Sequence, residues 1–185
     1  MMGIFTRLEN YISQKSDSNL VIAIAAIFYF TNQIVIGSII HPLGTLNALA
    51  LQTTMCSEKF KGIASGWISS GEIEIYYKHF QFDHYHPLLY GIFLSLLIAR
   101  AFKISHVNPR FNWIMLTPFI AAFCDVFENM MHLYFLADLN RATPLLVAVS
   151  GLATNIKWLL SLSGTALAIV LIAFWIIKKF IIKNM

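Results

Sequence analysis

Charged side chains are scarce in this sequence. Asp, Glu, Lys and Arg together make up 12% of its 185 residues, whereas a typical soluble domain has about 25%. Apolar residues make up 58% of the chain, which excludes an ordinary water-soluble domain and indicates an all-α integral membrane protein. Because each span needs ~20 apolar residues, the chain has room for about four spans and one modest segment outside the membrane.

Cysteine is also rare, and nucleotide-binding signatures are missing. Cys124 lies inside an apolar stretch and Cys56 in a connecting segment, so their difference in depth disfavours a disulfide. The sequence has neither a glycine-rich phosphate loop nor a dinucleotide fingerprint. The net charge of +4 comes from lysines that flank apolar stretches, so we expect no nucleic acid as a partner. The sequence identifies no cofactor.

Four apolar stretches define the expected membrane-spanning helices. His41-Pro42 follows the first stretch where a helix would stop, and Pro87 is tolerated in the first turn of the second. The first 19 residues are polar and lack the apolar core of a signal peptide, so we expect the first stretch to be a retained anchor. The sequence therefore predicts a single transmembrane domain, 1–185, built as a four-helix bundle. Its spans are residues 20–40, 87–102, 113–136 and 157–177.

The last apolar stretch is longer than a membrane crossing requires. It begins at Pro144 and continues well beyond the ~20 residues of a span. Trp158 and Trp175 would lie about 26 Å apart in a helix, which suits the aromatic belts at the two membrane surfaces. We therefore expect residues 144–156, interrupted by Gly151, to form a tilted or interfacial extension outside the span.

The distribution of basic residues predicts the orientation. With the N-terminus inside, eight of the 13 Lys and Arg residues lie on the inner side, which places both termini in the cytoplasm by the positive-inside rule. Residues 41–85 then form an outer loop. A composition rich in Asn, Lys and Ile favours a bacterial inner membrane. The inner basic residues are Arg7, Lys15, Arg100, Lys103, Arg110, Lys178, Lys179 and Lys183.

The outer loop is rich in aromatic residues and has helical periodicity. Ser69 and Glu72 match a capping box that would open a second helical segment. We expect two short amphipathic helices whose apolar faces rest on the membrane surface or roof the bundle, the alternative being an interfacial loop without chemistry. The first helix is indicated by the spacing of Phe60, Ile63, Ala64 and Trp67.

A polar stripe interrupts the third apolar stretch. Its four members follow one another at helical steps, so they share one face of the predicted helix. A carboxylate at bilayer depth costs roughly 3 kcal/mol or more, so the stripe should face protein or water and serve a function, the alternative being a purely structural pairing. The stripe consists of Asp125, Glu128, Asn129 and His132.

Polar residues from the other spans fall in the same outer half of the membrane. We therefore expect an outward-facing pocket lined by acidic residues and histidine. Simpler explanations exist: Asp83 would cap a helix, Lys157 would snorkel to the surface, and Tyr90 would serve packing. The side-chain amides of Asn32, Gln33 and Asn129 would join neighbouring helices by hydrogen bonds. The expected substrate-binding residues are Asn32, Gln33, Asp83, His86, Tyr90, Asn129, Lys157 and Ser161.

This set of residues predicts acid-base chemistry. Asp125 and Glu128 lie one turn apart, so one can hold a proton while the other accepts one, with His132 as a relay. We expect a membrane enzyme that acts on a lipid or other hydrophobic substrate, with these three residues catalytic. A metal site at Glu128 and His132 matches no specific zinc signature, so no metal is assigned.

Two other classes of function use the same stripe. The first is a lipid-binding or sterol-binding protein, or a transporter coupled to protons or cations. The second is a structural subunit whose polar stripe faces a partner membrane protein or a second copy of the chain. Membrane lipid is the expected partner in every case.

The layout resembles the family of sterol isomerases and sigma-2-type ligand-binding membrane proteins. In that family, too, an outer loop with a tryptophan leads into a span bearing an acidic residue, and carboxylates line a sterol-sized pocket. Trp67, Asp83 and the Asp125/Glu128 pair occupy comparable places here. The family's aromatic-Asp-Pro motif is missing from the loop, so its catalytic assignments are not transferred.

Overall fold

The computed structural model describes residues 3–183, and this part of the chain is all-helical, as the sequence predicts. Four segments are long and apolar enough to cross a membrane, which indicates a membrane location. These segments are Asn19–Leu43, His86–Ile104, Pro109–Ala137 and Pro144–Ile181. The α-helices are α1 (Ile4–Lys15), α2 (Asn19–Ile40), α3 (Thr45–Thr53), α4 (Ser57–Ser70), α5 (Ile73–Asp83), α6 (His86–Ile104), α7 (Thr117–Ala137) and α8 (Pro144–Lys183). Short 3-10 helices are η1 (His41–Leu43), η2 (Pro109–Leu116) and η3 (Leu139–Arg141).

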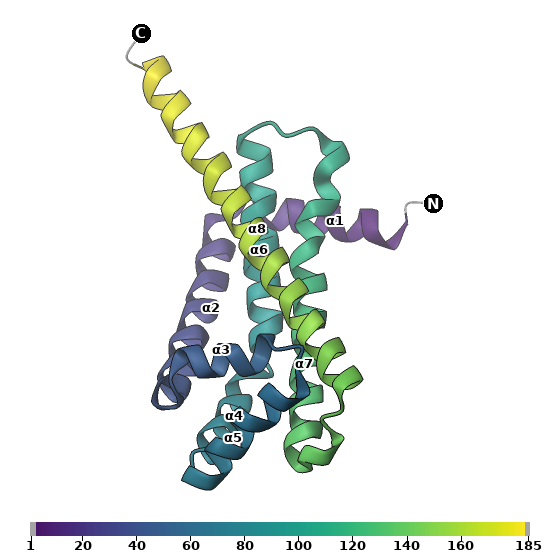
Figure 1. Ribbon diagram of the computed structural model, residues 1–185. Coiled ribbons are helices and arrows are strands. Elements are labelled where there is room, and N and C mark those ends of the chain that lie inside the picture. The colour runs from purple at the N-terminus through teal and green to yellow at the C-terminus, as the bar shows by residue number, and fades with distance from the viewer. Residues whose placement is uncertain (1–2, 184–185) are drawn as a thin grey trace.

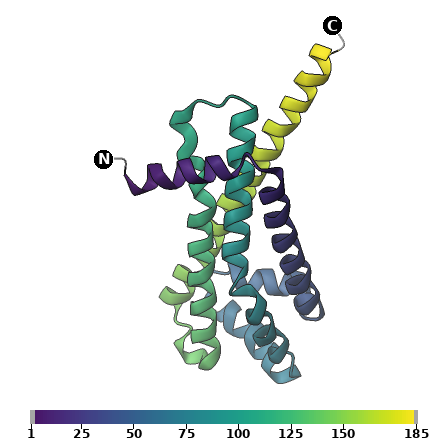
Figure 2. The same cartoon turned by 180° about the vertical axis from the view of Figure 1, so that it is seen from behind.

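The long helices pack side by side in a bundle (Figure 1). α6 and α7 form a hairpin joined through η2, α8 crosses both obliquely, and α2 lies along α6 at the edge. Figure 2 shows α1 lying across the hairpin end of the bundle, roughly at right angles to the long helices. The opposite end, where α3, α4 and α5 gather, is called the cap end, and these three helices are the cap.

The cap is a packed roof on the bundle. Its apolar side chains form one buried cluster with the last turns of α7 and the start of α8, so the cap cannot be an independent surface loop. The cap has three α-helices where the sequence predicted two. Central members of the cluster are Leu51, Phe60, Trp67, Tyr76, Phe80, Phe135 and Val147.

The predicted capping box between α4 and α5 is not formed. Glu72 is itself the N-cap of α5 and makes no side-chain capping bond, and its carboxylate instead accepts a hydrogen bond from the Ser70 hydroxyl at 2.9 Å. Gly71, with φ of 75°, ends α4 in the left-handed conformation that glycine adopts without steric cost. The glycine therefore separates the two helices two residues beyond the expected Ser69 position.

α8 is one continuous helix, which corrects the expectation of a break at Gly151. At 1.5 Å per residue its 40 residues extend about 60 Å, roughly twice the thickness of a hydrocarbon core. Proline occurs only at its first position, Pro144, where it is tolerated. Gly151 serves contact instead, because a side chain there would collide with the backbone carbonyl of Thr54 in the α3–α4 connection.

Two segments at the hairpin end differ from the sequence prediction. The first 19 residues, expected to be a polar tail, contain α1, whose Ile12 is buried against the bundle while Phe5 and Tyr11 are exposed. The third apolar stretch begins in the 3-10 helix η2, and α7 itself starts at Thr117 rather than Trp113. Proline in the first turn of α7 accounts for this later start.

Candidate functional site

The polar stripe of α7 faces the interior of the bundle. Asp125 is 3% exposed and Glu128 is fully buried, whereas Phe123 on the opposite face is 73% exposed. Asn129 and His132 are buried on the same side as the carboxylates. The apolar face of α7 is therefore turned outward, and the polar face meets α8 and the cap, as expected of a helix that crosses a membrane.

Lys157 on α8 joins the two carboxylates. Its Nζ donates to Asp125 Oδ1 at 2.9 Å and to Glu128 Oε2 at 2.5 Å, and the residue is 7% exposed. The ammonium thus lies inside the bundle and does not reach the surface, contrary to the snorkelling explanation. We call Asp125, Glu128 and Lys157 the acid-lysine cluster.

The acid-lysine cluster has an excess of negative charge. Two carboxylates share a single ammonium, and Glu128 Oε1 has no hydrogen-bond partner among residues 3–183. An unpartnered carboxylate oxygen in a buried site is costly unless a further positive group or a proton compensates it. The arrangement can therefore accept one more positive charge.

A second group of polar residues connects α7 to the cap. The hydroxyl of Tyr76 and Nδ1 of His132 share a hydrogen bond of 2.9 Å. Burial raises the pKa of Tyr76 well above its ordinary value, so the hydroxyl keeps its proton at neutral pH. Sequence reasoning missed Tyr76 and also His79, because nothing in the loop's periodicity tells which aromatic residue meets α7.

His79 and Asp83 continue this line along α5. Nδ1 of His79 donates to the carbonyl of Tyr76, and its Nε2 lies 3.7 Å from Asp83 Oδ2. Burial lowers the pKa of His79, so the imidazole is neutral near pH 7 and does not offset the Asp83 carboxylate. Asn129 donates to the backbone carbonyl of Asp83 at 3.5 Å, which fastens α5 to the stripe.

The predicted pocket residues are divided between the site and its surroundings. Asp83 is the last residue of α5 and caps no helix, since the N-cap of α6 is Tyr85. Gln33 is exposed on α2, away from the polar groups. Ser161 is half-buried, and its carbonyl accepts a hydrogen bond from Thr165 within α8.

α2 and α6 meet through a separate polar contact. Asn32 Nδ2 donates to the carbonyl of Phe82 at 3.3 Å and lies 3.1 Å from Nδ1 of His86. The His86 ring stacks on Tyr29, with centroids 5.5 Å apart. Tyr90, one turn further along α6, is buried, and its hydroxyl has no partner in the described part of the chain. These residues form a boundary between the acid-lysine cluster and the α2 edge.

The site is closed. Two hollows on the molecule, of about 440 and 290 Å³, are lined by other residues, and none of the stripe residues borders either of them. Within residues 3–183 no group of three His, Cys, Asp or Glu side chains is arranged to hold a metal ion. Both cysteines are free thiols, Cys56 at the surface and Cys124 partly buried. None of the residues expected to line a pocket borders either hollow.

Acidification should destabilise the fold through His79. Its pKa is lowered in the folded protein, whereas an exposed histidine in the unfolded chain titrates near about 6.5. The stability that His79 contributes is therefore complete above that unfolded pKa and is lost as the pH falls through it. We expect His79→Gln to reduce the loss in free energy of unfolding between about pH 7.5 and 5.5, followed by tryptophan fluorescence in detergent.

The neighbouring His84 provides the control for this experiment. Its ring is exposed at the end of α5, so His84→Gln should leave the pH dependence of unfolding as it is in the wild type. If the free energy of unfolding of His79→Gln varies with pH as it does in the wild type, His79 is not the source of the destabilisation by acid.

Comparison of the chain with protein-family models, with curated proteins and with solved structures finds no match.

Proposed function

We propose that this chain is a multi-pass membrane protein that couples reversible proton binding at the acid-lysine cluster to transport across the membrane. The observation that carries the proposal is the shared ammonium of Lys157, which pairs with both Asp125 and Glu128 inside the bundle. When both carboxylates are ionised, one negative charge stays uncompensated. Binding a proton removes that charge, and releasing the proton restores it, which makes the cluster a two-state element.

Protonation has a mechanical consequence in this geometry. Lys157 belongs to α8, and the two carboxylates belong to α7, so the ion pairs hold these helices together. A protonated carboxylate no longer attracts the ammonium as a charge, which weakens the hold of α7 on α8. Proton binding is thereby linked to the relative position of two long helices, the kind of linkage that coupled transport requires.

A line of proton-bearing groups leads from the cluster towards the cap. His132 lies one turn from Glu128 on the same face of α7. Its imidazole shares a hydrogen bond with the Tyr76 hydroxyl. His79 donates to the backbone carbonyl of Tyr76 and lies 3.7 Å from Asp83, whose side chain is 11% exposed. These polar groups lie between the buried carboxylates and the cap end, which supports proton entry from that side.

The membrane setting of the proposal rests on the surface of the bundle. Ile27 and Phe28 of α2 and Phe123 of α7 are exposed outward, which suits contact with lipid. The excess of basic residues at the hairpin end favours a cytoplasmic position for both termini. The high share of Ile supports a bacterial inner membrane.

The enzyme hypothesis is a second candidate, favoured by one hollow. The 290 Å³ hollow between α2 and α6 is wholly lined by apolar side chains, including Leu89 next to the buried Tyr90. An acyl chain held there would bring a lipid towards His86 and Tyr90, on the way to Asp125. Acid-base catalysis by Asp125 and Glu128, with His132 as a relay, would then act on that lipid.

Proton counting tests the proposal. An exposed glutamate titrates near about pH 4.3, outside the range between about pH 5 and 9. We expect wild-type protein in detergent to take up about one proton more than Glu128→Gln over that range, because the charge balance of the cluster requires it. The control is Glu74→Gln, an exposed residue of α5, which should match the wild type.

The outcomes separate the two candidates. Equal proton uptake by wild type and Glu128→Gln would overturn the proton-binding proposal. A membrane lipid that changes in cells expressing the wild type, but not in cells expressing Asp125→Asn/Glu128→Gln, would select the enzyme. The lipid extracts are compared by mass spectrometry.

A further inference from the structure

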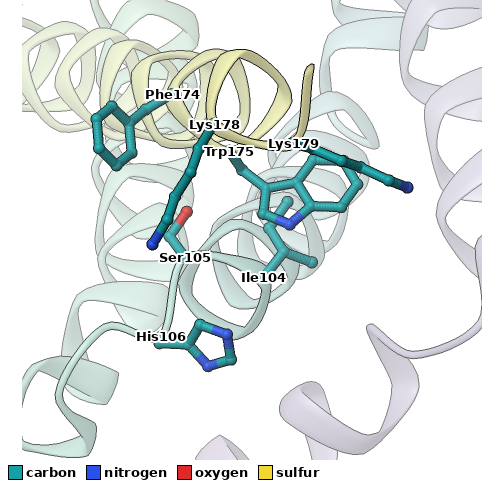
Figure 3. A pocket seen from close by; sticks show the side chains of 7 residues that line it. All are labelled: Ile104, Ser105, His106, Phe174, Trp175, Lys178 and Lys179. Carbon is teal, nitrogen blue, oxygen red and sulfur yellow. The ribbon is translucent and has the colours of Figure 1, made fainter. Parts of the chain in front are cut away.

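The larger of the two hollows lies at the hairpin end of the bundle. None of the stripe residues borders it. It forms where α8 continues past the end of α6, and its volume is about 440 Å³ (Figure 3). Seven residues from the two segments border it. They are Ile104, Ser105, His106, Phe174, Trp175, Lys178 and Lys179.

The polar lining of this hollow is basic and uncompensated. Lys178, Lys179 and His106 border it, and no acidic residue does. No ion pair within residues 3–183 involves either lysine. Asp17, an acidic residue at the same end, is held by Lys103 at 2.8 Å. The lining therefore presents positive charge to an anion.

The two lysines flank the hollow on different sides (Figure 3). Figure 3 shows Lys178 extending towards Ser105 and His106, while Lys179 passes the ring of Trp175 on the other side. Lys179 Nζ lies 5.0 Å from the centroid of that ring. The hydroxyl of Ser105 donates to the carbonyl of Leu171 at 3.1 Å, which fixes the end of α6 to α8.

The backbone at His106 contributes to this arrangement. Its φ of 54° lies in the left-handed region, which is uncommon for residues other than glycine. The conformation turns the chain at the end of α6 and leaves the imidazole exposed at the hollow. The imidazole at this turn thus borders the hollow together with the lysines of α8.

The remaining lining is apolar and continues onto α8. Phe174 and Ile104 border the hollow, and Ile177 and Phe180 are exposed on adjacent positions of α8. Trp175 is a residue type that concentrates at the boundary of a membrane. A ligand that fits this surface has an anionic group next to an apolar part.

We infer that this hollow binds the headgroup of an anionic phospholipid from the cytoplasmic leaflet. The lipid phosphate meets Lys178 and His106. Lys179 adds positive charge at the rim beside Trp175, and the acyl chains lie along Phe174 and the exposed face of α8. Basic pockets between membrane helices on the cytoplasmic side suit anionic headgroups, and each nearby lysine strengthens the attraction. A free phosphate ion would use the same basic groups but gain nothing from the apolar lining, so the lining favours the lipid. The inference does not depend on proton binding at the acid-lysine cluster.

Native mass spectrometry of the full chain tests this inference. The protein is released from micelles that contain equal amounts of dioleoyl phosphatidylglycerol and dioleoyl phosphatidylcholine. We expect preferential retention of phosphatidylglycerol by the wild type, with affinity lowered about fivefold in Lys178→Gln and about 25-fold in Lys178→Gln/Lys179→Gln. The matched control is Lys78→Gln, an exposed lysine at the cap end, which should retain the lipid like the wild type.

Three results would overturn the inference. The first is equal retention of the two lipids by the wild type. The second is a loss of phosphatidylglycerol in Lys78→Gln as large as in Lys178→Gln. The third is full displacement of the lipid by excess inorganic phosphate, which would assign the hollow to a soluble anion.

Discussion

Replacing Lys157 by Met is expected to lower the free energy of unfolding by about 3–5 kcal/mol, because it leaves a buried pair of carboxylates without their counter-charge. Met has nearly the length and volume of the lysine side chain, so the change removes the ammonium while largely preserving the packing. Asp125 Oδ1 and Glu128 Oε2 would both lose their hydrogen-bond donor. The penalty should be smaller at low pH, since protonated carboxylates need no positive partner.

The measurement is reversible unfolding of the purified protein in mixed micelles by increasing SDS. Lys78→Met is the control, because Lys78 is exposed on α5 and makes no ion pair with any residue in the range 3–183. Its stability should stay within about 0.5 kcal/mol of the wild type. A loss below about 1 kcal/mol in Lys157→Met would show that water already reaches the carboxylates.

The polar stripe was predictable because local periodicity determines which residues share a helix face. Asp125 and His132 are two turns apart, and burying that face follows from the cost of charge in a membrane. The partner of the carboxylates was harder to identify. Lys157 lies 32 residues after Asp125, and whether it turns inward depends on how α8 packs on α7. From the sequence alone, a lysine at the end of a span is expected to snorkel to the surface rather than to neutralise Glu128.

The connection between the stripe and the cap could not be derived from the sequence. Tyr76 meets His132 over a separation of 56 residues. The helical periodicity of the loop predicts helices there but does not show which of their residues meets α7. The reason for a glycine at position 151 could not be derived from the sequence either. A glycine in a helical stretch predicts either a weak point or a close contact, and only the position of Thr54 shows that contact is the reason here.

The amphipathic α1 escaped prediction for a different reason. Its exposed Phe5, Leu8 and Tyr11 alternate with polar residues, so the average over the segment looks polar. A helix that lies across the end of the bundle needs one apolar face and no long apolar run. Reading the segment by its periodicity rather than by its average would have identified it.

The variant Asp125→Leu/Glu128→Met/Lys157→Met should recover most of the stability lost in Lys157→Met. Replacing a complete buried charge group by apolar residues of similar size is often neutral, or stabilising by about 1–4 kcal/mol, because no charge is left to desolvate. We therefore expect the triple variant to unfold at an SDS concentration close to that of the wild type. The cluster is then not needed for folding.

Proton binding should be lost in the same triple variant, although its stability is retained. With no carboxylate or ammonium left in the cluster, the triple variant should lose the proton that the wild type exchanges between about pH 5 and 9, although its fold is preserved. Indicator-dye titration and SDS unfolding on one preparation measure both properties. A stable triple variant that still exchanges this proton would locate proton binding outside the cluster. One that is as unstable as Lys157→Met would mean that the charges are part of the fold itself, and that α7 and α8 pack correctly only when Lys157 bridges them.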